Sequence, residues 1–253
     1  MTSRHLTGVV LGLLLAGCAT EGPRSLDTAS RLRVAATAES QGQMDVALSM
    51  YGSAAAHDPD NAQAQSRFAT ALARSGNRQQ AEQILAAALE RRPNERGLMV
   101  QLGRMRLQSG QVGEALTLFD RVLAADARSV EALDGRGVAL DLMGRHPEAQ
   151  ETYRRAQALS PNSVAIANNL GLSLLLDGRP DEARAVLEPL ARRPDANERV
   201  TANYGISLAA TGDVAAARTV LGEAGGDVAA LGDAFRAPGR QIIEVTPSAS
   251  PPG

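Results

Sequence analysis

A repeat of 34 residues runs through most of the chain and constrains its fold more than any other feature. Glycine marks the same position in every unit: Gly42, Gly76, Gly110, Gly144, Gly178 and Gly212. Alanine marks a second position: Ala47, Ala81, Ala115, Ala149, Ala183 and Ala217. The six units are residues 28–61, 62–95, 96–129, 130–163, 164–197 and 198–231. A repeat of this length predicts a solenoid, in which each unit packs on the next.

Two further positions pair small residues with large ones. The small residues are Ala35, Ala69, Gly103, Gly137, Gly171 and Gly205, and the large apolar ones are Tyr51, Leu85, Phe119, Tyr153, Leu187 and Leu221. Two antiparallel helices per unit explain both, since a small residue lets two backbones approach and a large one fills the remaining gap. The repeated glycine would end the first helix in a left-handed conformation. Proline at Pro59, Pro93 and Pro161 would end the second helix.

This pattern resembles the tetratricopeptide repeat. The resemblance implies an all-α tetratricopeptide-repeat solenoid of about six helix-turn-helix units over residues 28–231. Gly225 and Gly226 interrupt the last unit, and residues 227–236 are predicted to form a short capping helix. Such a cap is expected because the last unit of a solenoid would otherwise leave its outer face bare. Residues 237–253 are predicted to be disordered.

The amino terminus is predicted to be a targeting segment. Arg4 gives a positive start, and residues 6–17 form an apolar stretch that is short for a membrane span but suits a signal peptide. The stretch leads into LAGC at residues 15–18, which resembles the bacterial lipoprotein signal. Residues 1–17 would then be removed and Cys18 lipidated. The alternative is a secretory signal that happens to contain a cysteine.

The lipoprotein resemblance carries a location with it. Ala19 follows the cysteine, which in lipoproteins of this type implies sorting to the outer membrane. We therefore expect a lipid-anchored protein of the outer membrane that faces the periplasm. Residues 18–27 would be a short linker, which holds the solenoid close to the membrane.

The composition and the motifs argue against catalysis and against nucleic-acid binding. The formal net charge is −2, and there is no basic stripe. Beyond the predicted signal peptide the only histidines, His57 and His146, lie in turn-like contexts and are expected to be solvated. No metal-binding spacing or glycine-rich phosphate loop is present. We predict a non-enzymatic protein with no catalytic residues, no metal, no cofactor and no small-molecule substrate.

The stretch NNLGLSLLLDG at residues 168–178 points to a binding surface. It is expected to be the first helix of unit five, with Leu170 and Leu174 in the core and the other leucines on another face. In tetratricopeptide repeats that face lines the concave surface. The predicted partner-binding groove consists of Val138, Leu142, Asn168, Leu172, Leu175, Leu176 and Ile206. An exposed apolar patch of this kind usually marks a binding site. The alternative is that the capping helix or a neighbouring unit covers these leucines.

Polar residues around the groove are expected to have two roles. The carboxylates of Glu131, Asp134 and Asp141 would form an acidic rim. Asn169 and Asn203 would bond the backbone between units instead of binding a ligand.

Residues 137–156, 168–179 and 187–191 are similar to a narrower family, the TadD lipoproteins of Tad, or Flp, pilus assembly systems. The resemblance implies a pilotin-like role, in which the protein helps the outer-membrane secretin of the pilus to reach the membrane and assemble. The implied partners are that secretin or other pilus assembly proteins, and the membrane itself through the lipid anchor. The alternative is a periplasmic scaffold for peptidoglycan enzymes or other envelope complexes. Neighbouring genes would separate the two.

Overall fold

The computed structural model describes residues 26–236, and all its regular elements are helical. The predicted signal peptide, Cys18, most of the linker and the predicted disordered tail lie outside the described residues. The first helices of the six units are α1 (Thr28–Ser40), α3 (Ala62–Arg74), α5 (Arg96–Gln108), α7 (Val130–Leu142), α9 (Val164–Leu176) and α11 (Glu198–Ala210). The second helices are α2 (Met44–His57), α4 (Arg78–Arg91), α6 (Val112–Ala125), α8 (His146–Leu159), α10 (Pro180–Ala191) and α12 (Val214–Leu221). A 3-10 turn, η1 (Gly222–Gly225), then leads to α13 (Val228–Arg236). The all-α solenoid is confirmed.

Local sequence signals set the ends of the first helices. Most of them begin after a residue whose side chain accepts a hydrogen bond from a backbone N–H of the first turn: Asp27, Asn61, Ser129, Ser163 and Asn197. All six first helices end two residues before the repeated glycine, whose φ lies between 71° and 91°. The residue after each glycine donates its N–H to the carbonyl five positions earlier, at 2.8–2.9 Å. These bonds satisfy carbonyls that the helix end would otherwise leave without partners.

The small and large positions of the repeat meet inside each unit, as predicted. A Cβ atom added to Gly137 would lie 2.4 Å from the ring of Tyr153, and one added to Gly171 would lie 2.5 Å from Leu187. All six alanines of the repeat are fully buried. The two helices of a unit therefore pack at a distance that only these small residues allow.

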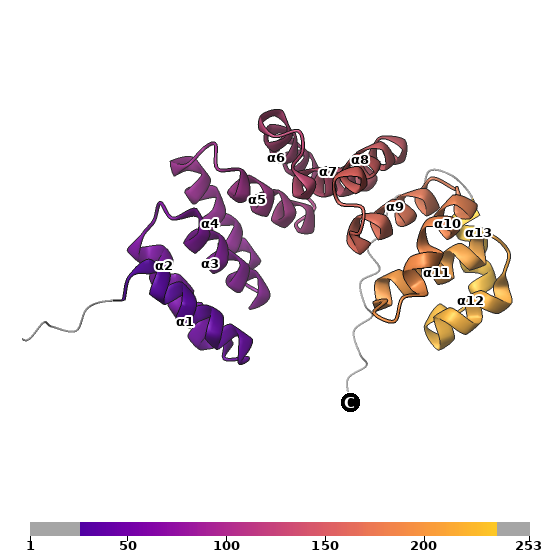
Figure 1. Cartoon of the computed structure of the whole chain (residues 1–253), viewed down its shortest axis with the longest axis horizontal. Coiled ribbons are helices and arrows are strands. Elements are labelled where there is room, and N and C mark those ends of the chain that lie inside the picture. Colours follow the sequence, from indigo (N-terminus) through magenta and orange to yellow (C-terminus); the bar gives the residue numbers. More distant parts are fainter. Residues whose placement is uncertain (1–25, 237–253) are drawn as a thin grey trace, which may run out of the picture.

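The stack is curved, and the first helices line its inner side. Adjoining first helices pack against each other from α3 through α5, α7 and α9 to α11, whereas no comparable packing joins adjoining second helices in the described part of the chain. In a curved stack of helices, neighbouring helices on the inner side lie closer together than those on the outer side. Figure 1 shows the resulting arch, with α1 and α2 at one end and α12 at the other.

The carboxyl-terminal end departs from the repeat. The helix α12 spans only 8 residues and stops at Gly222, which has a φ of 57°. The expected C-terminal helix follows as α13, and Asp227 caps it by accepting from the N–H groups of Ala229 and Ala230. Among the described helices, none is both long enough and apolar enough to span a bilayer.

Candidate interaction surface

An apolar stripe crosses the inner side of units four to six. It consists of Val138 on α7, Leu172 on α9 and Ile206 on α11, which occupy the same position of the repeat. All three side chains are half-buried, so each presents part of its surface to solvent. In units one to three the same position holds Ala36, Thr70 and Arg104. The stripe is therefore confined to the carboxyl-terminal half of the solenoid.

The other residues of the predicted groove divide into accessible and covered ones. Leu142 is half-buried like the stripe. Asn168, Leu175 and Leu176 are buried, with exposed fractions of 2%, 0% and 4%. Leu175 belongs to a core cluster that also contains Ala210, and Phe235 of α13 packs against that cluster. Leu175 therefore fits the alternative that the terminal helix or a neighbouring unit covers these leucines.

A recurring hydrogen bond joins the units beside the stripe. Nδ2 of Asn169 donates to Oδ1 of Asp134 at 2.9 Å, and Nδ2 of Asn203 donates to Oδ1 of Asn168 at 3.0 Å. Both bonds join residues 35 positions apart, so the same pair of repeat positions is used twice. The expectation that the two asparagines bond backbone is wrong, because their partners are side chains. The pair Asn168-Asn169 thus links α9 to the helices on both sides.

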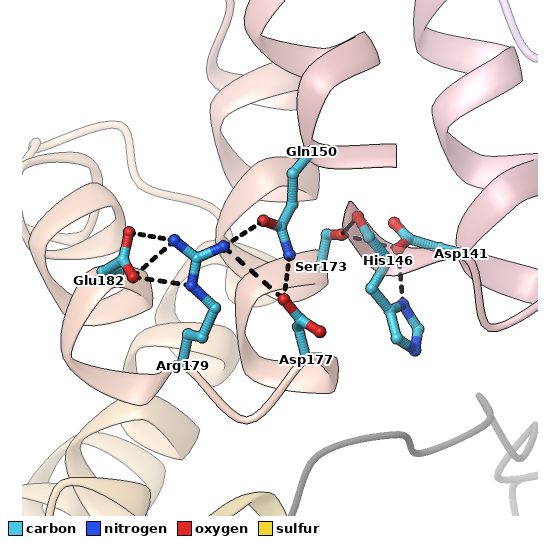
Figure 2. A network of polar contacts seen from close by, with 7 residues as sticks. All are labelled: Asp141, His146, Gln150, Ser173, Asp177, Arg179 and Glu182. Atoms are coloured by element: carbon cyan, nitrogen blue, oxygen red, sulfur yellow. Dashed lines mark hydrogen bonds and ion pairs between the residues drawn. The ribbon is translucent and has the colours of Figure 1, made fainter. Parts of the chain in front are cut away.

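A buried polar cluster lies where units four and five meet (Figure 2). The carboxylate of Asp141 accepts from the hydroxyl of Ser173 at 2.7 Å and from the hydroxyl of Tyr153 at 3.1 Å. Nδ1 of His146 lies 2.9 Å from the same carboxylate, in a hydrogen bond. Asp141 and His146 are 4% and 2% exposed. Asp141 is therefore not part of an acidic rim, and the prediction of a solvated His146 is also wrong.

Burial dominates the electrostatics of this cluster. It raises the pKa of Asp141, although the hydrogen bonds from His146 and Ser173 act in the opposite direction. It also raises the pKa of Tyr153 well above its ordinary value, and the nearby charge of Asp141 adds to that effect. The hydroxyl of Tyr153 therefore stays protonated and serves as a hydrogen-bond donor.

The cluster has the residue types of a hydrolase triad but a different arrangement. The hydroxyl of Ser173 donates to the carboxylate of Asp141, so it is bonded to the acid. The side chain of Ser173 is fully buried, like its neighbours. A nucleophile needs its hydroxyl bonded to a base and open to substrate. The geometry fits a packed polar core that fixes one unit against the next.

A second polar group in Figure 2 continues this junction toward α10. Nε2 of Gln150 on α8 donates to Asp177 at 3.0 Å, and Nη1 of Arg179 donates to the amide oxygen of Gln150 at 2.6 Å. Arg179 also forms a two-bond pair with Glu182, at 2.6 and 2.7 Å. These contacts join units four and five. No cluster of histidine, cysteine and acidic side chains suited to a metal occurs within residues 26–236.

A sequence signal for the cluster existed and was missed. Two units carry tyrosine at the large apolar position, and both carry a carboxylate twelve residues earlier. In unit one the hydroxyl of Tyr51 donates to Glu39 at 2.8 Å, as Tyr153 does to Asp141 in unit four. A buried hydroxyl requires an acceptor, which explains why the two residue types occur together.

Comparison with known proteins gives a family. Models described as tetratricopeptide repeat match residues 38–102, 100–164, 135–198 and 168–226. A search of curated protein sequences finds no match.

Several solved structures are similar in fold. A tetratricopeptide repeat protein from Parabacteroides merdae aligns with a TM-score of 0.67 at 17% identity, over 83% of this chain and 84% of that chain. The pilF protein of Pseudomonas aeruginosa gives a TM-score of 0.67 at 16% identity, over 83% and 96%. A thermophilic repeat protein from Thermus thermophilus gives 0.61 at 20% identity, over 72% and 98%. At these identities the likeness concerns the fold alone.

Proposed function

Because this chain belongs to the tetratricopeptide repeat family, whose stacked repeats form protein-interaction scaffolds, we propose that it is a non-enzymatic assembly factor for a secretin. The secretin would be the outer-membrane component of a Tad, or Flp, pilus, and the protein would act as its pilotin. The observation that carries the proposal is the apolar stripe of Val138, Leu172 and Ile206, which three neighbouring helices present on the inner side of the arch.

The form of the stripe suits a protein segment better than a small ligand. Its three side chains occupy the same repeat position in three consecutive units, so they follow the direction of the stack instead of closing around one point. A peptide helix or an extended strand that runs along the inner side would contact each unit in turn. Leu142 extends the apolar contact on α7.

The lipid anchor would supply the location. Acyl chains on Cys18 would hold the solenoid at the outer membrane, and the groove would carry the secretin segment there. Stable anchoring requires more than one chain, and lipoproteins of this class carry several. The proposal therefore requires both the groove and the cysteine.

The amount of detergent-resistant secretin multimer in outer membranes tests this function. We expect the multimer to be lost without the protein, to return with the wild type, and not to return with Cys18→Ser. An unchanged multimer in the absence of the protein would remove the pilotin role.

A further inference from the structure

The terminal helix α13 does not continue the stack. At each junction between units, the second helix of one unit packs on the first helix of the next, as α10 does on α11. A seventh first helix would accordingly pack on α12. Instead α13 packs mainly against α11, only lightly against α12, and reaches α9. It lies over Ala209 and Ala210 of α11. These two residues occupy the repeat positions that Leu175 and Leu176 of the predicted groove occupy in unit five.

One face of α13 makes this contact. Val228 is 1% exposed and packs in a cluster with Leu208 and Ala209 of α11. Gly232 lies where the two helices cross, and a Cβ atom there would be 2.3 Å from the carbonyl oxygen of Ala209. Phe235 packs against the cluster that contains Leu175 and Ala210. The contact residues of α13 are thus at i, i+4 and i+7, the pattern of a helix bound in a groove.

An arginine completes the contact at the end of α11. Nε of Arg236 donates to the carbonyl oxygen of Ala210 at 3.0 Å. Ala210 is the last residue of α11, where carbonyls have no partner within the helix. A charged donor at this end of a helix is also favoured by the helix dipole.

The attachment of α13 is suited to release. Within α13 only Val228 and Gly232 are buried. The connection from α12 contains Gly222 and Gly226, both at positive φ, 57° and 52°. Glycine at such positions changes conformation with little steric hindrance. A helix with so few buried residues, on a glycine-rich connection, can leave its groove without disturbing the units below.

We infer that α13 is a replaceable occupant of the groove on α9 and α11, and that this groove binds an amphipathic helix of a partner. The partner helix carries a small residue where it crosses Ala209, an apolar residue four positions earlier and an aromatic residue three positions later. Displacement of α13 uncovers Ala209, Ala210 and the cluster around Leu175. The inference rests on the proposed interaction role but not on the identity of the partner.

The test uses the full chain and a probe taken from the chain itself, a fluorescent peptide of residues 227–236. In the wild type the tethered α13 competes with the peptide at an effective concentration of about 1 mM. Gly232→Leu adds bulk against the backbone of Ala209 and frees the groove. We expect this variant to bind the peptide at least about tenfold more tightly than the wild type does. Ala230→Leu, which places the same leucine side chain at an exposed position of α13, should bind like the wild type.

Two further measurements make the result decisive. A peptide that itself carries Gly232→Leu should bind none of the proteins. Arg236→Ala, which loosens α13 without adding bulk, should also increase binding of the unaltered peptide. Circular dichroism checks that each variant keeps its helices. Equal peptide binding by the wild type, Gly232→Leu and Arg236→Ala would overturn the inference. Absence of peptide binding by both of these variants would overturn it as well. The secretin assay is independent, so failure of the pilotin role would leave this result standing.

Discussion

The hydroxyl of Tyr153 donates a hydrogen bond to the carboxylate of Asp141 across the two helices of unit four. Both residues are buried, and Ser173 of the next unit donates to the same carboxylate. The repeat thus uses one polar contact to fix the packing within a unit and between two units. The same pair in unit one, Tyr51 and Glu39, has a more accessible carboxylate and provides a natural control.

Tyr153→Phe should lower the free energy of unfolding by about 1–2 kcal/mol, because it removes a donor from a buried carboxylate. Tyr51→Phe should have a smaller effect, since the side chain of Glu39 is 19% exposed and also pairs with Arg74. Urea denaturation followed by circular dichroism measures both. A larger loss for Tyr51→Phe would contradict the role of burial.

The raised pKa of Asp141 predicts a dependence of stability on pH. In the unfolded chain this pKa returns to its ordinary value of 3.8. Between 3.8 and the raised value the folded state binds more protons, so the free energy of unfolding falls as the pH rises. The stabilisation is fully present below 3.8 and is lost above the raised pKa.

Asp141→Asn removes this titration and leaves the other carboxylates in place. We therefore expect the free energy of unfolding of the wild type, minus that of the variant, to fall as the pH rises from below 3.8 through the raised pKa of Asp141. Urea titrations at several pH values give this difference. A difference that is constant or rises with pH would show that burial does not raise the pKa of Asp141.

Two glycine substitutions should have opposite effects. Gly137→Ala places a Cβ atom 2.4 Å from the ring of Tyr153 and should destabilise the protein by about 1–3 kcal/mol. Gly113→Ala, in α6, meets no atom within 4 Å and should stabilise it by up to about 1 kcal/mol. Thermal melting compares the two. Equal effects would mean that the helices of unit four separate more easily than their packing indicates.

Leu172→Arg should weaken binding of the secretin, because it places a charge in the middle of the apolar stripe. Helicity should be kept, since Leu172 is half-buried and an arginine can reach solvent from there. Thr70→Arg makes the matched change at the same repeat position of unit two and should leave binding intact. Pull-down with the purified secretin measures both. Unchanged binding by Leu172→Arg would place the site elsewhere on the solenoid.

The architecture could be predicted from the sequence because one local rule recurs six times. Gly178 shows why: a glycine at the end of every first helix takes the same positive φ and sets the same turn. The contact of Gly171 with Leu187 was predictable for a similar reason, since a small and a large residue hold the same two positions throughout. Such rules depend only on the unit itself.

The site was predicted less well because it depends on exceptions to the repeat. Position within the unit placed Asp141 on the concave surface, yet the hydroxyls of Tyr153 and Ser173 draw it into the core. Leu175 was expected on the same surface, and it is buried in a cluster that Phe235 joins from α13. The helix α13 lies outside the repeat, so the 34-residue period cannot predict where it packs. That contact depends on Gly232, a glycine that belongs to no column of the repeat.

The neighbour-to-neighbour packing of the six units has a mechanical consequence. Each unit touches the units beside it, and from α1 to α12 no extensive contact joins one end of the arch to the other. A pulling force along the chain is then carried by the junctions in series, so the weakest junction yields first and the rest stay folded. The polar cluster between units four and five strengthens one of these junctions. Under tension the protein should therefore lengthen in steps, with the junction between units four and five among the last to open.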